Sequence, residues 1–209
     1  MIILSYSTIN MLKISSHNWL NKQMGIEVPD NEYFRNGKRL HRIIQDHVGG
    51  IKEHENLKHI NYKFKYVERV DFDPKCRIWY KVNDKYGIHG YVDGFDPDTK
   101  KILEIKTGST MWGIKKFIDS PQRKIYGLAK PSYEETVLIT TVNDSEWKNI
   151  PPKTMTVPIT EKDKEEAIEW IMEGIEIIEK GEFTGGLDED GKCRDRFCYY
   201  GVNCQFKDR

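Results

Sequence analysis

Two acidic residues and a lysine, close together in the chain, have the types and spacing of a metal-dependent hydrolytic site. Asp93 follows the apolar segment 87–92, and Glu104 and Lys106 stand two residues apart in the segment 101–107. Carboxylates are hard oxygen ligands that suit Mg²⁺ or Mn²⁺. Such an ion lowers the pKa of a bound water and neutralises charge on a phosphate. The stretch therefore predicts a divalent-metal site with a cation beside it, as phosphodiester hydrolysis requires.

A β-hairpin is the element that must position these residues. Apolar residues alternate along the second strand, so Glu104 and Lys106 share one face and Ile105 lies on the other. The Asp-Pro-Asp sequence at 96–98 is a turn former. We therefore expect the hairpin to bring Asp93 opposite the polar face, with the backbone carbonyl of Ile105 as a further oxygen ligand.

The Glu-x-Lys tripeptide is weak evidence by itself, because 32% of the residues are charged. Glu146-Trp147-Lys148 repeats the spacing in a polar segment. A cross-strand ion pair on a solvated face is the simpler interpretation of an isolated copy. The larger set favours chemistry at the first copy, since Gln122-x-x-x-Tyr126 follows it closely.

This set resembles the PD-(D/E)xK nuclease superfamily, in its RecB/Cas4-like exonuclease branch. Gly37-x-x-x-His41 resembles the helix of that branch whose histidine binds metal, and Gln122-x-x-x-Tyr126 resembles the motif that touches DNA beside the site. The opening segment 5–19 resembles the family's N-terminal helix. The resemblance implies an α/β fold, with a central mixed β-sheet flanked by helices and a restriction-endonuclease-like core.

The resemblance also implies roles for single residues. Asp93, Glu104 and Lys106 would be catalytic, and the metal ligands would be His41, Asp93, Glu104 and the backbone carbonyl of Ile105. The expected cofactor is Mg²⁺ or Mn²⁺. The DNA contacts would come from Gln122, Arg123, Lys124 and Tyr126.

Basic clusters flank the predicted site and are candidates for phosphate contacts. For any one of them, simple surface solvation is the plainer interpretation. They are Arg35, Lys38, Arg39 and Arg42, then Lys115 and Lys116, then Arg123 and Lys124.

The C-terminal tail holds three of the four cysteines, Cys193, Cys198 and Cys204. Their spacing resembles the end of the iron–sulfur signature of Cas4-like nucleases. Asp195 and Ser15, however, occupy two positions where the family has cysteine. A [4Fe–4S] cluster that recruits Cys76, a zinc site on the tail and free thiols all stay open, and free thiols are favoured.

The length of 209 residues predicts one domain, with N-terminal helices at 1–58, a core at 59–182 and the cysteine-containing tail at 183–209. Basic and acidic residues number 33 each, which argues against a protein held to nucleic acid by bulk charge alone. No apolar run approaches the ~20 residues of a membrane span, and no basic leader precedes the apolar start. A cytoplasmic protein is the expectation.

Periodicity predicts the remaining elements. Helices are expected from Ser7 to about residue 24, over 33–54 and 111–129, and after Thr160 with a stripe of Ile168, Met172 or Ile171, Ile175 and Ile178. Strands are expected over 60–66, 78–82, 87–92, 101–107, 136–142 and 155–157.

These predictions together indicate a Mg²⁺- or Mn²⁺-dependent deoxyribonuclease, acting as an exonuclease on single-stranded DNA or DNA ends in recombination, repair or replication. A non-catalytic DNA- or partner-binding module on the same fold is the alternative from another class. The intact Asp93, Glu104 and Lys106 favour the enzyme, because a module freed from catalysis has no need for so costly a cluster of charges. A restriction-type endonuclease is a third interpretation.

Overall fold

The computed structural model describes residues 1–26, 32–68, 73–142 and 150–181. Within them the strands form two mixed sheets. The smaller sheet has the order β1 (Ile2–Leu4), β4 (Tyr86–Tyr91), β3 (Arg77–Lys81), and the larger has the order β2 (Tyr66–Val67), β5 (Gly94–Asp96), β6 (Lys101–Gly108), β7 (Glu135–Val142), β8 (Lys153–Pro158). In each sheet one pair is parallel, β1 with β4 and β6 with β7, and the others are antiparallel.

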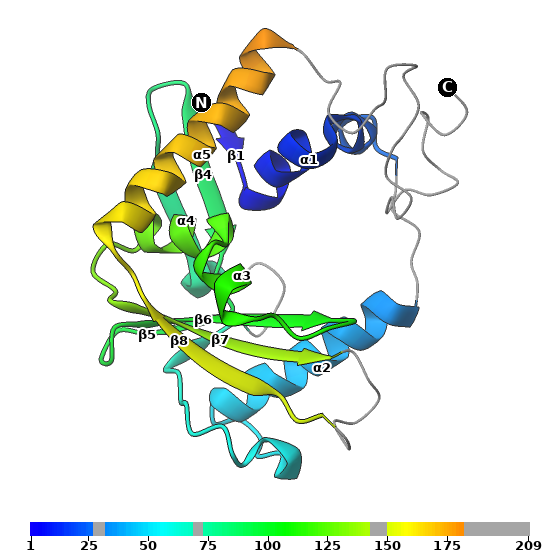
Figure 1. Cartoon of the computed structure of the whole chain (residues 1–209), viewed down its shortest axis with the longest axis vertical. Coiled ribbons are helices and arrows are strands. Elements are labelled where there is room, and N and C mark those ends of the chain that lie inside the picture. The colour runs from blue at the N-terminus through cyan, green and yellow to red at the C-terminus, as the bar shows by residue number, and fades with distance from the viewer. Residues whose placement is uncertain (27–31, 69–72, 143–149, 182–209) are drawn as a thin grey trace.

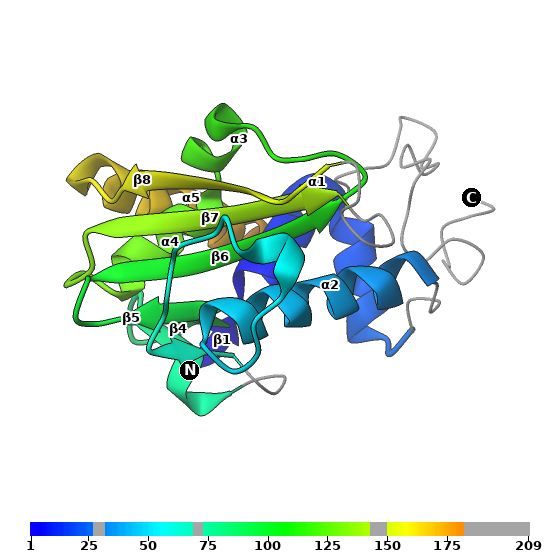
Figure 2. The ribbon, with the colours of Figure 1, turned by 90° about the horizontal axis from the view of Figure 1, so that it is seen from below.

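Helices cover both sheets, which confirms the predicted α/β class, although the strands form two mixed sheets where one central sheet was predicted (Figure 1). The helices are α1 (Tyr6–Gln23), α2 (Glu32–Val48), α3 (Ile114–Ile118), α4 (Pro121–Ala129) and α5 (Glu161–Lys180), and short 3₁₀ turns occur at Glu55–Leu57 and Pro74–Cys76. In Figure 1 the larger sheet is seen edge-on, with α2 on one face and α3 on the other. Figure 2 shows α2 crossing that sheet obliquely.

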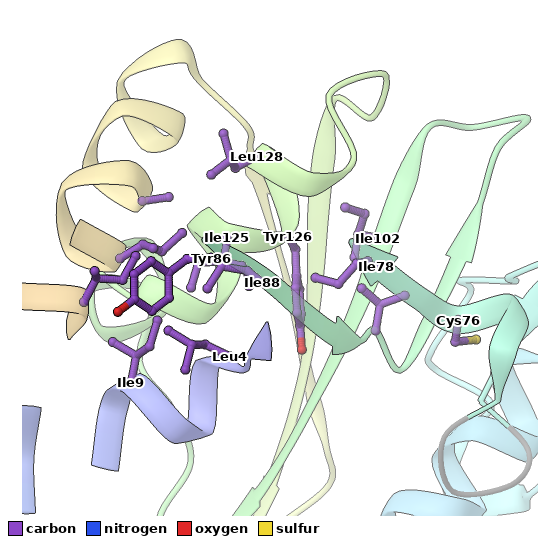
Figure 3. Packing of buried hydrophobic residues seen from close by; sticks show 14 residues of the cluster. Leu4, Ile9, Cys76, Ile78, Tyr86, Ile88, Ile102, Ile125, Tyr126 and Leu128 are labelled. Atoms are coloured by element: carbon purple, nitrogen blue, oxygen red, sulfur yellow. The ribbon is translucent and has the colours of Figure 1, made fainter. Parts of the chain in front are cut away.

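Three apolar clusters hold these layers together. The first joins α1, α4 and α5 to the smaller sheet, and Figure 3 shows its side chains from Leu4 to Leu128. The second packs α2 against β6 and β7, and the third packs Phe117 of α3 against the opposite face. Leu103 and Ile105 of β6 belong to the second cluster, while Ile102 belongs to the first. The predicted alternation of β6 is therefore confirmed.

The chain crosses from one sheet to the other between β4 and β5. β4 pairs with β1 and β3, whereas β5 pairs with β2 and β6. Only Val92 and Asp93 lie between the two strands. Asp93 is thus fixed at the junction of the sheets, and not within a simple hairpin.

Two predicted helix ends differ from the structure. The N-cap of α1 is Ser5 and not Ser7, since the Ser5 side chain accepts a hydrogen bond from the backbone N–H of Thr8. α2 ends at Val48 and not near residue 54, because Gly49 and Gly50 follow, and Gly50 takes the left-handed φ of +69° that glycine tolerates.

The helix predicted over 111–129 is two helices. α3 ends at Ile118, and α4 begins with Pro121 at its first position. Proline fits the first turn of a helix, but it lacks a backbone N–H and disfavours the helical conformation of the preceding residue. The single-helix prediction overlooked this break.

The strand predicted over 60–66 is mostly not a strand, and β2 contains only Tyr66 and Val67. Ile60 and Phe64 are nevertheless buried, as part of the cluster that covers α2. Their alternation reflects burial of one side of a segment that has no neighbouring strand to pair with.

α5 begins as predicted at Thr160, which forms a capping box with Asp163. Its buried stripe includes Ala167, Ile171 and Ile175. Ile168 and Met172 are 38% and 45% exposed, so the prediction that placed them in the core was wrong and the alternative, Ile171, was right. A helix turns about 100° per residue, and one misplaced position is enough to turn a side chain to solvent. No helix among the described residues is long and apolar enough to cross a membrane.

Candidate active site

Asp93 is held from two directions at the sheet junction. Its Oδ2 accepts a hydrogen bond of 2.5 Å from the backbone N–H of Ile105, and its Oδ1 lies 3.2 Å from Nε2 of His41. Burial alone would raise the pKa of Asp93, but the charge and hydrogen bond of His41 outweigh it, and the pKa is lowered. Asp93 therefore stays ionised, which a metal ligand or an anionic catalytic group requires.

His41 reaches this carboxylate from the middle of α2. Burial opposes its protonation, but Asp93, by charge and by hydrogen bond, raises the pKa of the imidazole above its ordinary value. Gln45, one helical turn further along α2, points Nε2 at the backbone carbonyl of Asp93, 3.4 Å away. The i, i+4 spacing from His41 is the sequence signal that could have identified Gln45.

Glu104 and Lys106 meet on the face of β6 opposite Leu103 and Ile105. Lys106 Nζ lies 2.5 Å from Glu104 Oε1, and the Glu104 side chain is 4% exposed. The second oxygen, Oε2, is buried and has no hydrogen-bond partner among the described residues. Burial, and then the charge of Asp93, raise the pKa of Glu104 to about 7 against the lowering effect of Lys106. Burial alone would lower the pKa of Lys106, but Glu104 more than compensates, so the lysine stays protonated.

Gln122 and Tyr126 of α4 complete a chain of hydrogen bonds. Lys106 Nζ donates to Gln122 Oε1 at 2.6 Å, and Gln122 Nε2 donates to the Tyr126 hydroxyl at 2.5 Å. That hydroxyl donates to the carbonyl of Tyr91, 3.1 Å away, at the end of β4. The chain fixes Lys106 against both sheets.

The prediction that Tyr126 contacts DNA requires its side chain to be accessible, but the structure buries it. It is 3% exposed and stands inside the apolar cluster of Figure 3, and burial, then the charge of Glu104, hold its pKa well above the ordinary value. Its ring cannot stack on a base without leaving that cluster. Its hydroxyl is linked to Lys106 through Gln122, which agrees in geometry with the other prediction, orientation of Lys106.

Arg123 is a correction to the predicted DNA contacts, and Lys124 is engaged in an ion pair in this structure. Arg123 is 1% exposed and forms a bidentate pair with Asp163, so no phosphate can reach it. Lys124 pairs with Glu166 and its side chain is 14% exposed. Both residues join α4 to α5. Their basic character suggested phosphate binding, but residues next to Gln122 on a helix point away from the face that Gln122 occupies.

His41, Asp93 and Glu104 carry ligand atoms that suit a divalent metal, but in this structure their side chains do not converge on one point. Among the described residues no three His, Cys, Asp or Glu side chains are placed to hold a metal ion together. His41 and Asp93 are paired with each other, and Glu104 faces Lys106. The orphaned, buried Oε2 of Glu104 is the observation that fits a hard cation, because a buried carboxylate oxygen without a donor is costly.

A cavity of about 790 Å³ opens beside His41. Four of the predicted basic residues line it, namely Lys38, Arg39, Arg42 and Lys116. Trp112 also lines it, and the sequence analysis missed this residue. Arg42 Nη1 donates to the carbonyl of Glu68, 2.8 Å away, which fixes one wall. The cavity thus places positively charged side chains next to the pair of His41 and Asp93.

Cys76 is the only cysteine within the described residues, and it lies in the first apolar cluster with 0% exposure. Burial, and then the charge of Asp73, raise the pKa of its thiol to about 12, which disfavours the thiolate that a cluster or zinc needs. Cys193, Cys198 and Cys204, the second Glu-x-Lys at 146–148 and the side chain of Ser15 lie outside what the structure describes.

No protein-family model matches the chain, and no curated protein matches it. Solved structures do match. SSO0001 aligns with a TM-score of 0.61 at 14% identity, over 98% of this chain and 87% of its own length. A protein from Eubacterium rectale named "Putative exonuclease" aligns with a TM-score of 0.50 at 12% identity, over 86% and 82%. The alkaline exonuclease LHK-Exo from Laribacter hongkongensis gives a TM-score of 0.46 at 11% identity, over 85% and 90%. At these identities the first two similarities show a shared fold.

Proposed function

We propose that this chain is a divalent-metal-dependent nuclease that hydrolyses phosphodiester bonds of DNA. The observation that carries the proposal is that two charge pairs meet at β6, Asp93 with His41 and Glu104 with Lys106, and that both acids are largely shielded from solvent. The order of these residues along the chain also resembles the PD-(D/E)xK pattern. The name of the Eubacterium rectale protein, which has the same fold, agrees with this function.

The expected metal is Mg²⁺ or Mn²⁺, and its ligands would be His41, Asp93, Glu104 and the carbonyl of Ile105. Carboxylate and carbonyl oxygens are the hard donors that these ions prefer, and Mn²⁺ also accepts an imidazole. When bound, the ion would lower the pKa of a water and offset negative charge on the phosphate. Asp93 is already ionised and pre-positioned by the Ile105 N–H for this role.

Lys106 would act as a fixed cation beside the scissile phosphate. Its raised pKa keeps it protonated near neutral pH, so it orients water and stabilises developing charge but does not serve as a general base. Gln122 Oε1 accepts a second hydrogen bond from the same ammonium. This chain of contacts fixes Lys106 before substrate binds, which lowers the cost of ordering it during the reaction.

The proposed mode is exonucleolytic, on single-stranded DNA or at DNA ends. The basic cavity beside His41 gives the phosphates of such a strand a place next to the reacting groups. The chain as a whole is electrically neutral, so this local charge, and not the net charge, would attract the substrate.

Cleavage of end-labelled DNA tests the proposal. Purified protein should degrade labelled single-stranded or double-stranded DNA with Mg²⁺ or Mn²⁺ and lose this activity in EDTA. Asp93→Ala should be inactive. Asp98→Ala is the matched control, because Asp98 is a surface carboxylate paired with Lys65, and it should keep wild-type activity.

Metal binding can be measured separately from cleavage. Mn²⁺ at one hundred times its Kd should stabilise the fold by about 2.7 kcal/mol in thermal melts, because it binds only the folded state. Asp93→Ala should lose this shift and Asp98→Ala should keep it. A wild-type protein indifferent to Mn²⁺ would refute the metal site. A metal response without cleavage of any DNA would favour the non-catalytic module instead.

A further inference from the structure

Aromatic and basic side chains line the same cavity beside His41. Tyr33 and Phe34 belong to the first turn of α2, the helix that also carries most of the basic residues of the cavity, and Trp112 comes from the segment after β6. Trp112 follows β6 on the chain, and Figures 1 and 2 both show the C-terminal end of β6 directed toward the N-terminal half of α2. Cationic and aromatic side chains thus share one cavity that adjoins the proposed site of hydrolysis.

Trp112 is anchored more firmly than a loop residue usually is. Its backbone N–H donates to Oγ1 of Thr140, 2.9 Å away, and Thr140 is fully buried in β7. Its side chain packs against the third apolar cluster, which contains Phe117 and Leu138. The indole is therefore held in place before any ligand arrives.

Two lysines mark the position of this ring relative to the reacting groups. Lys106 Nζ lies 5.2 Å from the ring centroid, and Lys116 Nζ lies 4.3 Å from it. Lys106 belongs to the proposed catalytic set, so a phosphate held by Lys106 lies within one nucleotide of the indole. Lys116 is exposed and can turn from the ring to a phosphate.

We propose that Trp112 is a base-stacking platform that selects an unpaired nucleotide of DNA next to the scissile phosphate. This inference rests on the proposed function and deepens it by naming the residue that would recognise an unpaired base. An aromatic face stacks on any base, while the basic wall formed by Lys38, Arg39 and Arg42 contacts the backbone. In duplex DNA both faces of a base are covered by neighbouring bases, so only a single strand or a frayed end can offer a free face.

Binding of two single strands that differ only in their bases tests this platform. The probes are a fluorescent oligothymidylate and an abasic strand of equal length, measured with Asp93→Ala protein in EDTA so that no cleavage occurs. Asp93→Ala protein that is otherwise unaltered should bind the oligothymidylate roughly 5- to 100-fold more tightly than the abasic strand, as stacking on a protein aromatic ring typically gives.

Trp112→Leu should abolish most of that ratio and leave binding of the abasic strand within twofold. Trp112→Tyr should restore most of it. The control is Trp79→Leu, since Trp79 is also exposed and lies near a cation, Arg77, but does not line the cavity. It should leave the ratio unchanged.

Three results would overturn the platform. Equal loss for both strands in Trp112→Leu would show that the indole only supports Lys106. An unchanged ratio would show that the bases are held elsewhere, and tighter binding of a blunt duplex than of a single strand would contradict the substrate class. This binding test needs neither metal nor cleavage. It can therefore fail while the nuclease proposal holds, and it can succeed while the nuclease proposal fails.

Discussion

Two ion pairs contact α4, one through Gln122 and one through Arg123, and they are completed to very different degrees. Arg123 donates to both oxygens of Asp163 and to the carbonyls of Ile118 and Pro158. Asp163 also accepts from the N–H and hydroxyl of Thr160, and its pKa is lowered because these donors outweigh its burial. Every charge of this pair has its partners.

The pair of Glu104 and Lys106 is less complete. One oxygen of Glu104 has no partner among the described residues, and the pKa of this carboxyl is raised to about 7. Asp93, a second acid, lies close enough to contribute to that shift. A buried charge that the fold leaves unsatisfied costs stability, and such perturbed groups concentrate at functional sites.

The difference separates a structural pair from a chemical one. Among the described residues, every guanidinium nitrogen and carboxylate oxygen of the pair of Arg123 and Asp163 has a hydrogen-bond partner, which leaves no free group for a ligand, and the pair joins α4 to α5. In the proposed function, the Glu104 oxygen that lacks a partner among the described residues is the group that would accept a cation. Each pair joins one acid to one base, but the Lys106 side chain is 21% exposed and the Arg123 side chain is 1% exposed, so access to solvent and the number of hydrogen-bond partners both distinguish the pairs.

The largest expected effect is loss of stability in Arg123→Ala. This change leaves the buried Asp163 and two carbonyls without their donors, and the free energy of unfolding should fall by about 3–5 kcal/mol. Urea denaturation followed by circular dichroism measures it. Lys162→Ala is the control, because the exposed Lys162–Glu166 pair should contribute no more than about 1 kcal/mol. If Arg123→Ala protein had normal stability but reduced affinity for DNA, the original prediction that Arg123 contacts DNA would be supported instead.

Next in size is the loss of rate in Lys106→Ala. Removal of a fixed charge-stabilising group should lower the single-turnover rate of DNA cleavage by about 10²–10³-fold. Lys101→Ala is the matched control, since Lys101 stands on the same strand but pairs with the surface residue Glu135. Equal loss of activity in Lys106→Ala and Lys101→Ala would contradict a specific catalytic role for Lys106.

A pH effect on stability should follow from Glu104. Its folded pKa of about 7 exceeds its ordinary value of 4.5, so the folded state binds the proton more tightly than the unfolded state. The resulting stabilisation is present below pH 4.5 and is lost as pH rises to about 7. Glu104→Gln cannot titrate, so the stability of wild type relative to this variant should fall across that window. A constant difference would show that Glu104 is satisfied in the folded protein.

The smallest expected effect belongs to Gln122→Ala. This change removes the link between Lys106 and Tyr126, a hydrogen bond to a charged group worth about 1.5 kcal/mol, or roughly tenfold in rate. The Mn²⁺-dependent rise in melting temperature should persist, because Gln122 contacts no proposed metal ligand directly. Loss of the metal response with normal turnover would instead make α4 a purely structural element.

Much of the candidate site was predictable because strand and helix periods are local. Alternation along β6 placed Glu104 and Lys106 together, and the spacing of Gln122 and Tyr126 placed these two on one face of a helix, whose position beside the site was implied by the family resemblance. His41 was assigned through the family resemblance, and the structure brings it to Asp93. Their roles in metal binding and catalysis remain predictions.

The sequence by itself determined which residues share a face of β6 and that helices flank mixed β-structure. Only the tertiary structure decided that Gln122 faces the site while Arg123, its neighbour, is buried against α5. It also decided that Asp93 lies where the chain leaves one sheet for another, and that Trp112 borders the basic cavity. The physical reason is that a local period fixes relative directions along one element, whereas the partner that each direction meets is set by how distant elements pack.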